Sequence, residues 1–194
     1  MQTEGTTYIN VAALHPNINN LGPGLRFVIW VQGCPFTCKN CISPNWIPFK
    51  VATPFSVNHL AELILAEKSI SGITISGGEP MMQAGRLSQL MKIVKSENKN
   101  LDVISFTGFE KENLVWQEAQ TFMQDIDVLI TGQYKEKLNN NKGLRGSSNQ
   151  KVIFLTDRLK EYEEYFLETK RNLNFYIDTD EVLMTGIPEK GFNW

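Results

Sequence analysis

Three cysteines constrain this chain more than any other feature of its sequence. They are Cys34, Cys38 and Cys41, the only cysteines among 194 residues, and their spacing is C-x3-C-x2-C. An odd number of cysteines cannot form a closed disulfide framework, and the rest of the chain offers these three no cysteine partner. Three thiols so close together therefore indicate a metal site.

The number of ligands separates two kinds of metal site. A structural zinc ion takes four protein ligands, so zinc would require His15 or His59 to reach the three cysteines. An iron–sulfur cluster is held by cysteine thiolates, and a cluster held by only three of them keeps one iron open to an outside ligand. The spacing favours the cluster, and an open iron indicates chemistry rather than a purely structural role.

Composition places the chain among globular proteins. The hydrophobic fraction is 42% and the aromatic fraction is 10%, and one core is expected for a single domain over 1–194. The net charge of −2 gives no footprint for DNA or RNA. No apolar run approaches the roughly 18 residues that span a bilayer, and residues 1–5 do not resemble a signal peptide. We expect a cytoplasmic protein, because reducing conditions keep thiolates available for a metal.

Strand-like and helix-like segments alternate along most of the chain. This pattern predicts an α/β fold with a parallel sheet and right-handed crossovers. A short edge strand is expected at 8–11, and a hairpin at 173–177 and 182–186 around an acidic turn, 178–181, which suits a solvated turn better than a calcium site. We expect a core at about 8–170 and a C-terminal extension at about 171–194. The main strands are predicted at 26–31, 72–76, 102–108, 126–131 and 151–155, and the helices at 57–68, 83–96, 112–122 and 158–170.

Several chemistry-bearing residues follow the predicted strands directly. Cys34 comes after the first buried strand, and Gly77-Gly78-Glu79-Pro80 comes after the second. In parallel sheets, ligands bind at the carboxyl ends of the strands, and two glycines let backbone approach a ligand closely. Ser105 and Thr107 end the third strand and are candidate donors to a ligand, although a hydroxyl that caps a turn is an equally good interpretation.

Together, the cysteine spacing and Gly77-Gly78-Glu79-Pro80 resemble the radical S-adenosylmethionine (SAM) superfamily. The resemblance implies a partial (β/α)6-type barrel of parallel strands with a C-terminal β-hairpin extension. It also implies a 4Fe-4S cluster whose unique iron binds SAM, which is cleaved reductively to a 5′-deoxyadenosyl radical. No side chain is then required as a general acid or base. The implied ligands are Cys34, Cys38 and Cys41 for the cluster, Gly77, Gly78, Glu79 and Pro80 for the methionyl end of SAM, the backbone at Asn40, Cys41 and Ile42 for its adenine, and Ser105 and Thr107 for its ribose or carboxylate.

Four further motifs resemble the glycyl-radical-enzyme activating proteins, in particular those of anaerobic ribonucleotide reductase. They are Asn20–Arg26, Pro44-Asn45-Trp46, Thr107-Gly108-Phe109 and Arg145-Gly146-Ser147-Ser148-Asn149-Gln150, and the resemblance covers about 8–155. It implies that the radical is passed to a glycine in a partner enzyme, such as the large subunit of anaerobic ribonucleotide reductase. It further implies a flavodoxin- or ferredoxin-type electron donor. Arg145, Ser147 and Asn149 are the residues we expect to contact the partner.

The chain departs from that family at two positions. Thr131-Gly132 stands where Asp-Gly is usual, which leaves Asp127 or Glu136 to supply a carboxylate, and Leu21 replaces a usual Asn. Two alternatives therefore stay open. One is a radical SAM enzyme that modifies a small molecule or a ribosomally made peptide, and the other is a non-enzymatic, zinc-binding interaction module.

Overall fold

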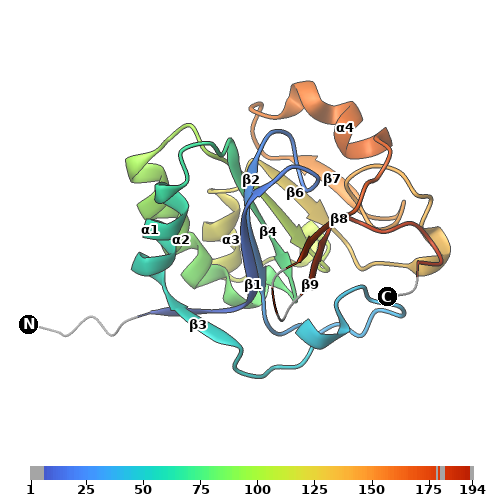
Figure 1. Ribbon diagram of the computed structural model, residues 1–194, viewed down its shortest axis with the longest axis horizontal. Helices are drawn as coiled ribbons and strands as arrows, with labels where there is room; N and C mark the ends of the chain where they lie inside the picture. Colours follow the sequence, from blue (N-terminus) through green and yellow to red (C-terminus); the bar gives the residue numbers. More distant parts are fainter. Residues whose placement is uncertain (1–6, 178, 180–181, 193–194) are drawn as a thin grey trace, which may run out of the picture.

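A seven-stranded sheet forms the centre of the molecule (Figure 1). The computed structural model describes residues 7–177, 179 and 182–192. The strands lie in the order β3-β1-β2-β4-β5-β6-β7. Their bounds are β1 Tyr8–Ile18, β2 Arg26–Val31, β3 Thr53–Ser56, β4 Gly72–Gly77, β5 Asp102–Thr107, β6 Val128–Thr131 and β7 Lys151–Phe154.

Four neighbouring strands, β2, β4, β5 and β6, run parallel. Parallel neighbours need a crossover, since a tight hairpin joins only antiparallel strands. One helix lies in each connection, and Figure 1 shows all three helices on the same side of the sheet. The predicted α/β fold with a mainly parallel sheet is confirmed. The helices are α1 Val57–Ala66, α2 Ala84–Glu97 and α3 Gln117–Met123.

The prediction that β7 continues the parallel sheet is wrong. β7 pairs with β6 in the antiparallel direction, with Thr131 opposite Lys151. The connection between them contains only the 3-10 turn η4 (Glu136–Leu138), so no helix returns the chain to the other end of the sheet. The sheet thus has four parallel strands rather than six, and its closure into a partial barrel stays a prediction.

The first strand is longer and more central than expected. The sequence predicts a short edge strand at 8–11, whereas β1 runs from Tyr8 to Ile18 and lies between β3 and β2. His15, Pro16 and Asn17 favour a turn, but the strand accommodates them through irregular pairing between His15 and Ile18. Asn17 there has a positive φ of 63°.

Two hydrophobic cores lie on opposite faces of the sheet. One packs α1, α2 and α3 against it, and the other lies under the C-terminal part of the chain. The helix predicted at 158–170 is shorter: the chain first makes the 3-10 turn η5 and only then the α-helix α4. No helix in the described ranges is long and apolar enough to cross a membrane. The remaining helical elements are α4 Glu163–Glu168 and the 3-10 turns η1 Pro44–Trp46, η2 Pro80–Gln83, η3 Lys111–Asn113 and η5 Lys160–Tyr162.

The C-terminal extension forms the predicted hairpin, β8 (Asn174–Ile177) and β9 (Val182–Thr185). Of its acidic turn, only Thr179 is among the described residues. Buried Asn20 fixes the extension, because its side chain donates to the carbonyl of Thr185 at 3.1 Å and accepts from the Thr185 hydroxyl at 3.2 Å.

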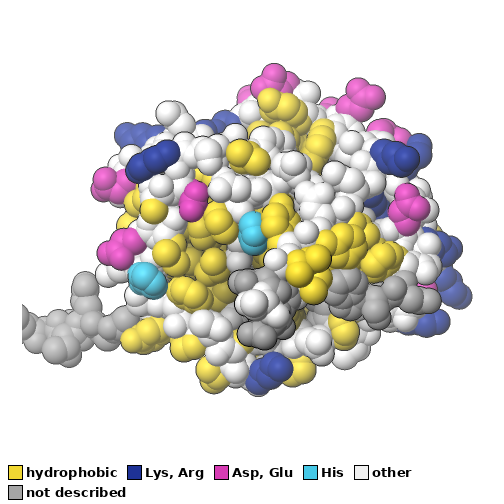
Figure 2. Space-filling model, in the orientation of Figure 1, with side chains coloured by type: hydrophobic (Ala, Val, Ile, Leu, Met, Phe, Trp, Pro, Cys, Tyr) yellow, Lys and Arg dark blue, Asp and Glu magenta, His cyan; other side chains and the backbone are white. Residues whose placement is uncertain are grey.

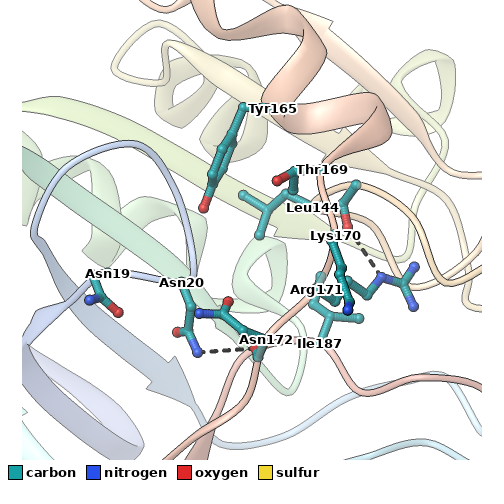
Figure 3. A pocket seen from close by; sticks show the side chains of 10 residues that line it. Asn19, Asn20, Leu144, Tyr165, Thr169, Lys170, Arg171, Asn172 and Ile187 are labelled. Carbon is teal, nitrogen blue, oxygen red and sulfur yellow. Dashed lines mark hydrogen bonds between the residues drawn. The ribbon is translucent and has the colours of Figure 1, made fainter.

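A half-open cavity of about 560 Å³ lies between the β1–β2 loop, α4 and the extension. Figure 3 shows Asn20 turned toward Asn172 on one side and Tyr165 above it. The Arg171 guanidinium closes the other side by donating to the carbonyl of Gly143 at 3.2 Å and to Asn139 Oδ1 at 2.7 Å. These contacts tie the extension to the core.

A buried ion pair closes the amino end of the parallel strands. Arg26 at the start of β2 is 0% exposed, and its Nη1 lies 2.5 Å from Asp102 Oδ1 at the start of β5. The same guanidinium donates to Thr74 Oγ1 at 3.1 Å and to the carbonyl of Ile73 at 2.8 Å. Burial lowers the pKa of Arg26 and raises the pKa of Asp102, and the attraction between the two groups opposes both shifts.

Candidate functional site

The cysteine loop leaves the carboxyl end of β2 and lies along the bottom of the molecule in Figure 1. Two main-chain hydrogen bonds close its base, from Gly33 N to Trp46 O and from Cys34 N to Ile47 O, both 2.9 Å long. The three thiols are free and half-buried. The fold thus delivers all three sulfur atoms to one closed loop at the edge where parallel sheets bind ligands.

The surroundings of the thiols favour their protonated form. Burial raises the pKa of Cys34 to about 11 and also raises the pKa of Cys38. A metal that binds there must therefore displace protons. Among the described residues, no three His, Cys, Asp or Glu side chains are already arranged to hold an ion. The donor set nevertheless fits an iron–sulfur cluster, since thiolates are its usual ligands.

Each of the two histidines that could supply the fourth ligand of a zinc site makes other contacts. The His15 ring on β1 packs against Tyr176 of the extension, with ring centroids 4.1 Å apart. His59 on α1 stacks on Phe55, and its Nδ1 lies 3.5 Å from Glu62. Both contacts favour the three-thiolate cluster over a four-ligand zinc site.

Gly77 and Gly78 bring the end of β4 against the stem of the cysteine loop. A Cβ on Gly77 would lie 2.4 Å from Val31 N, and a Cβ on Gly78 would lie 2.4 Å from Gly33 O. Only glycine allows this approach, which is sealed by a 2.8 Å hydrogen bond from Glu79 N to Gly33 O. The two glycines therefore fix the position of the loop that carries Cys34.

Glu79 is the carboxylate that joins β4 to β5. Its side chain is 1% exposed and accepts hydrogen bonds from Thr107 Oγ1 at 2.8 Å, Gly108 N at 2.7 Å and Met81 N at 2.9 Å. Burial raises its pKa to about 7, although all three hydrogen bonds act in the opposite direction. Pro80 follows as the buried first residue of η2. Glu79 is thus a structural link between two strand ends.

Ser105 and Thr107 both face the interior. Thr107 donates to Glu79 and accepts from Phe109 N at 3.1 Å, and Ser105 is 0% exposed. On β5 these two side chains share the face of Val103, which belongs to the core under the helices, whereas Ile104 faces the second core. Their contact with SAM stays a prediction.

The residues between the second and third cysteine contact the loop that follows β6. Asn40 has a positive φ of 56°, and its Nδ2 donates to Glu136 Oε1 at 2.5 Å. A backbone hydrogen bond from Tyr134 also reaches the Cys38 thiol. Ile42 is 43% exposed. Glu136 and Tyr134 were not expected to brace the cysteine loop, since nothing in the sequence shows that these loops meet.

Phe36, inside the cysteine motif, anchors the loop to β5. Its ring lies 4.8 Å from that of Phe109, which lies 5.3 Å from that of Trp116. Gly108 makes room for it, because a Cβ there would lie 2.5 Å from the Phe36 ring. Phe36 was not among the predicted site residues; the glycine before Phe109 was the available signal.

The residues Arg145–Gln150 fold onto the segment after β6. Ser147 is 0% exposed, and its Oγ accepts from Lys135 N at 3.0 Å. Asn149 Nδ2 donates to Gln133 O at 2.9 Å, and Gln150 Nε2 donates to Gly132 O at 2.7 Å. The motif therefore braces its own chain, and its contact with a partner stays a prediction.

The polar residues at the two ends of β6 have different surroundings. Thr131 Oγ1 is buried at the carboxyl end and has no hydrogen-bond partner within the described residues. Asp127 lies at the amino end, where it accepts from Thr156 Oγ1 at 2.6 Å and from Val103 N at 2.8 Å. Asp127 is therefore at the wrong end of the strand to replace the expected carboxylate.

The sequences of known proteins match most of this chain. Residues 20–153 match the family described as the 4Fe-4S single cluster domain. The anaerobic ribonucleoside-triphosphate reductase-activating protein of Enterobacteria phage T4 is 32% identical over 140 residues, which cover 70% of this chain and 88% of that protein. Its counterpart in Vibrio cholerae is 29% identical over 139 residues, which cover 68% and 88%.

A second group of relatives is longer than the matched region. The pyruvate formate-lyase-activating enzyme of Staphylococcus epidermidis is 26% identical over 151 residues, which cover 74% of this chain but only 60% of that enzyme. Together with the three-thiol loop, these matches establish the family and its cofactors. The chain belongs to the radical SAM family of glycyl-radical-enzyme activating proteins, whose cofactors are a 4Fe-4S cluster and SAM.

Proposed function

We propose that this radical SAM enzyme generates the glycyl radical of an anaerobic ribonucleoside-triphosphate reductase. One observation carries the choice of partner. The match covers 88% of the reductase-activating relatives but 60% of the pyruvate formate-lyase-activating enzyme, so the chain shares nearly the whole length of the former group alone.

The three cysteines are the proposed cluster ligands. Cys34, Cys38 and Cys41 would supply three thiolates to the cluster and would leave one iron open to SAM. When bound and reduced, the cluster supplies the electron that cleaves SAM to methionine and a 5′-deoxyadenosyl radical. The protein's contribution is to bind, orient and shield these groups. The main-chain bonds at Gly33 and Cys34 keep the loop from spreading.

The proposed SAM site lies where β2, β4 and β5 end. Backbone groups of Gly77, Gly78 and Pro80 bind the methionyl end, and Glu79 positions them by holding β4 to β5. The backbone at Asn40, Cys41 and Ile42 lies beside the adenine. Ser105 and Thr107 support this edge from within, with Thr107 acting through Glu79.

The proposed partner site is the segment 145–150, which folds onto the residues that follow β6. Ser147 acts indirectly, because its hydroxyl holds the main chain at Lys135. Of the three residues predicted to contact a partner, Arg145 and Asn149 are partly exposed, so a partner can reach them. We also propose that residues 1–194 form a single domain. The proposed location of the reaction is the cytoplasm, where reducing conditions keep thiolates available for a metal.

The test is formation of a glycyl radical in a defined anaerobic mixture. The chain, SAM and a chemical reductant are incubated with the purified reductase, and the radical is recorded by electron paramagnetic resonance (EPR). We expect the signal only when all four components are present, and we expect none with the Cys38→Ala chain. If SAM is cleaved but no reductase radical forms, the partner is wrong while the radical SAM activity stands.

A further inference from the structure

The two loops that meet around the cysteines differ in charge from the rest of the molecule. The segments 34–50 and 132–150 carry six of the 19 Lys and Arg residues but one of the 21 Asp and Glu residues. Their net charge is thus +5 in a chain of net charge −2. Such an asymmetry is a physical signal for a partner of opposite charge.

The single carboxylate of these loops is already engaged. Glu136 Oε1 accepts from Asn40 at 2.5 Å, and its Oε2 lies 3.9 Å from the Lys39 ammonium. These contacts bring the two loops together beside Cys38 and Cys41. Glu136 is 27% exposed at its side chain, so it offsets little of the outward-facing positive charge.

Of the exposed lysines on these segments, three lie beside the contact between Asn40 and Glu136. The side chain of Lys39 is 82% exposed and lies between the second and third cysteine, and Lys135 and Lys137 are exposed on either side of Glu136. We name Lys39, Lys135 and Lys137 the basic rim. In Figure 2, basic side chains gather along the lower right margin, the side on which the segment after β6 lies in Figure 1.

The reaction explains why a charged surface is useful there. Reductive cleavage of SAM consumes one electron that must come from another molecule, and the donor must approach the cluster. Electron-transfer complexes have small, short-lived interfaces. In such interfaces charge complementarity governs the rate of association more than the buried area does.

We propose that the basic rim docks the acidic surface of a one-electron carrier protein, which reduces the cluster; this inference rests on the proposed function. In a flavodoxin, the flavin hydroquinone anion gives up one electron and becomes the neutral semiquinone. The cluster gains that electron, and no proton is transferred. The rim acts on binding and leaves the chemistry of SAM unchanged.

The test compares two triple variants that change the net charge equally. The rim variant is Lys39→Glu/Lys135→Glu/Lys137→Glu, and the control is Lys68→Glu/Lys92→Glu/Lys99→Glu, three exposed lysines on and beside α1 and α2. The rate of cluster reduction is measured by stopped-flow absorbance. The reductant is reduced flavodoxin in one experiment and, in the other, the photogenerated deazaflavin radical, which is small and uncharged. No radical acceptor is present.

We expect flavodoxin to reduce the rim variant at least about tenfold more slowly than the control at low salt. The difference should shrink at high salt, which screens the charges, and deazaflavin should reduce both variants equally. Equal rates with flavodoxin would overturn the proposal. A parallel loss with deazaflavin would also overturn it, because the rim would then be acting on the cluster itself.

A second measurement covers a variant that does not load a cluster. Binding of flavodoxin to the iron-free chains is measured by calorimetry, and we expect about tenfold weaker binding for the rim variant than for the control. In a separate assay with the reductase added, a lower radical yield for the rim variant together with unchanged flavodoxin binding would show that the rim belongs to the radical acceptor and that the inference is wrong. Radical formation driven by deazaflavin tests the proposed function separately.

Discussion

The two ends of the parallel strands use polar groups in opposite ways. At the amino end, Arg26 and Asp102 are buried and paired at 2.5 Å, and the guanidinium is further bound by Thr74 and main-chain carbonyls. At the carboxyl end, the thiols of Cys34, Cys38 and Cys41 are half-buried on a loop held chiefly by its main chain. One end fixes the strands, and the other presents ligands.

This difference shows how a small sheet supports reactive groups. Loss of one partner from a buried ion pair is strongly destabilising. The amino end of the strands therefore tolerates few single substitutions. The carboxyl end depends on that rigidity, because Gly78 and Gly33 approach within a distance at which any Cβ would collide. Functional groups are best placed on such rigid supports.

The largest predicted effect is at the carboxyl end. Cys38→Ala should abolish cluster binding and reduce 5′-deoxyadenosine formation to background, because two thiolates remain where three are needed. The stability of the iron-free chain should change by less than about 1 kcal/mol, since Cys38 is half-buried. Iron analysis and product chromatography check the first point, and denaturant unfolding checks the second. The exposed neighbour Thr37→Ala is the control, and an iron-loaded, active Cys38→Ala chain contradicts the comparison.

The next effect concerns the amino end. Arg26→Met should lower the free energy of unfolding by about 3–5 kcal/mol, because it leaves Asp102 buried without its charge partner. The double variant Arg26→Met/Asp102→Leu should recover most of this loss. Denaturant titration of the three chains measures both changes. The iron bound per folded molecule should be the same in the wild-type chain and in both variants. A loss of iron in a folded variant would show that the amino end of the strands also controls cluster binding at the carboxyl end.

Glu79 is a buried carboxylate at the carboxyl end of the strands, and unlike Asp102 at the amino end it accepts no hydrogen bond from a cationic group within the described ranges. Its pKa is raised from 4.5 to about 7, so the folded chain holds a proton that the unfolded chain releases between these values. Stability from this group is therefore present below about pH 4.5 and is lost as pH rises through about 7, by up to about 3 kcal/mol.

The Glu79→Gln variant isolates the contribution of this carboxyl group to the pH dependence of stability. The iron-free wild-type chain should lose more stability than the variant between pH 5 and pH 8, as measured by urea unfolding at each pH. The variant lacks the titrating group, so only the slopes are compared and not the absolute stabilities. Parallel slopes for the two chains would mean that Glu79 is ionised throughout and is stabilised by its three hydrogen bonds.

The smallest effect tests the contact between the two glycine-bearing loops. Gly78→Ala should cost about 1–3 kcal/mol, because its Cβ would lie 2.4 Å from Gly33 O and one loop must move. It should also weaken SAM binding by the chain. Gly85→Ala on α2 is the matched control, since its Cβ would meet only the flexible side chain of Glu118 on α3, at 3.2 Å. Equal behaviour of the two variants would remove the argument for a required glycine.

The sequence predicts the parts of the fold that depend on local pattern. β-branched runs predicted β2 and β4, the i, i+3, i+4 spacing predicted α2, and the terminal hairpin was placed within one residue at each end. The sequence did not predict the direction of β7 or the full length of β1. Both depend on which strand a segment pairs with, and pairing partners are not encoded in local periodicity.

The same distinction applies to the site. The cysteine spacing alone predicts the metal ligands, because the three residues lie on one loop. The contacts of Thr107 with Glu79 and of Ser147 with Lys135 join segments that are 28 and 12 residues apart. The sequence did not show that these two hydroxyls bind their own chain, because burial decides which way a side chain points. The brace of Glu136 on Asn40 was missed for the same reason.

The central claim is that three thiolates hold a cluster with one iron open to SAM. The most direct test is the EPR spectrum of the reduced, anaerobically reconstituted chain before and after SAM is added. We predict a cluster signal whose g-values change when SAM binds, followed by 5′-deoxyadenosine formation. A colourless chain that contains zinc, or a cluster signal that SAM leaves unchanged, would contradict the account.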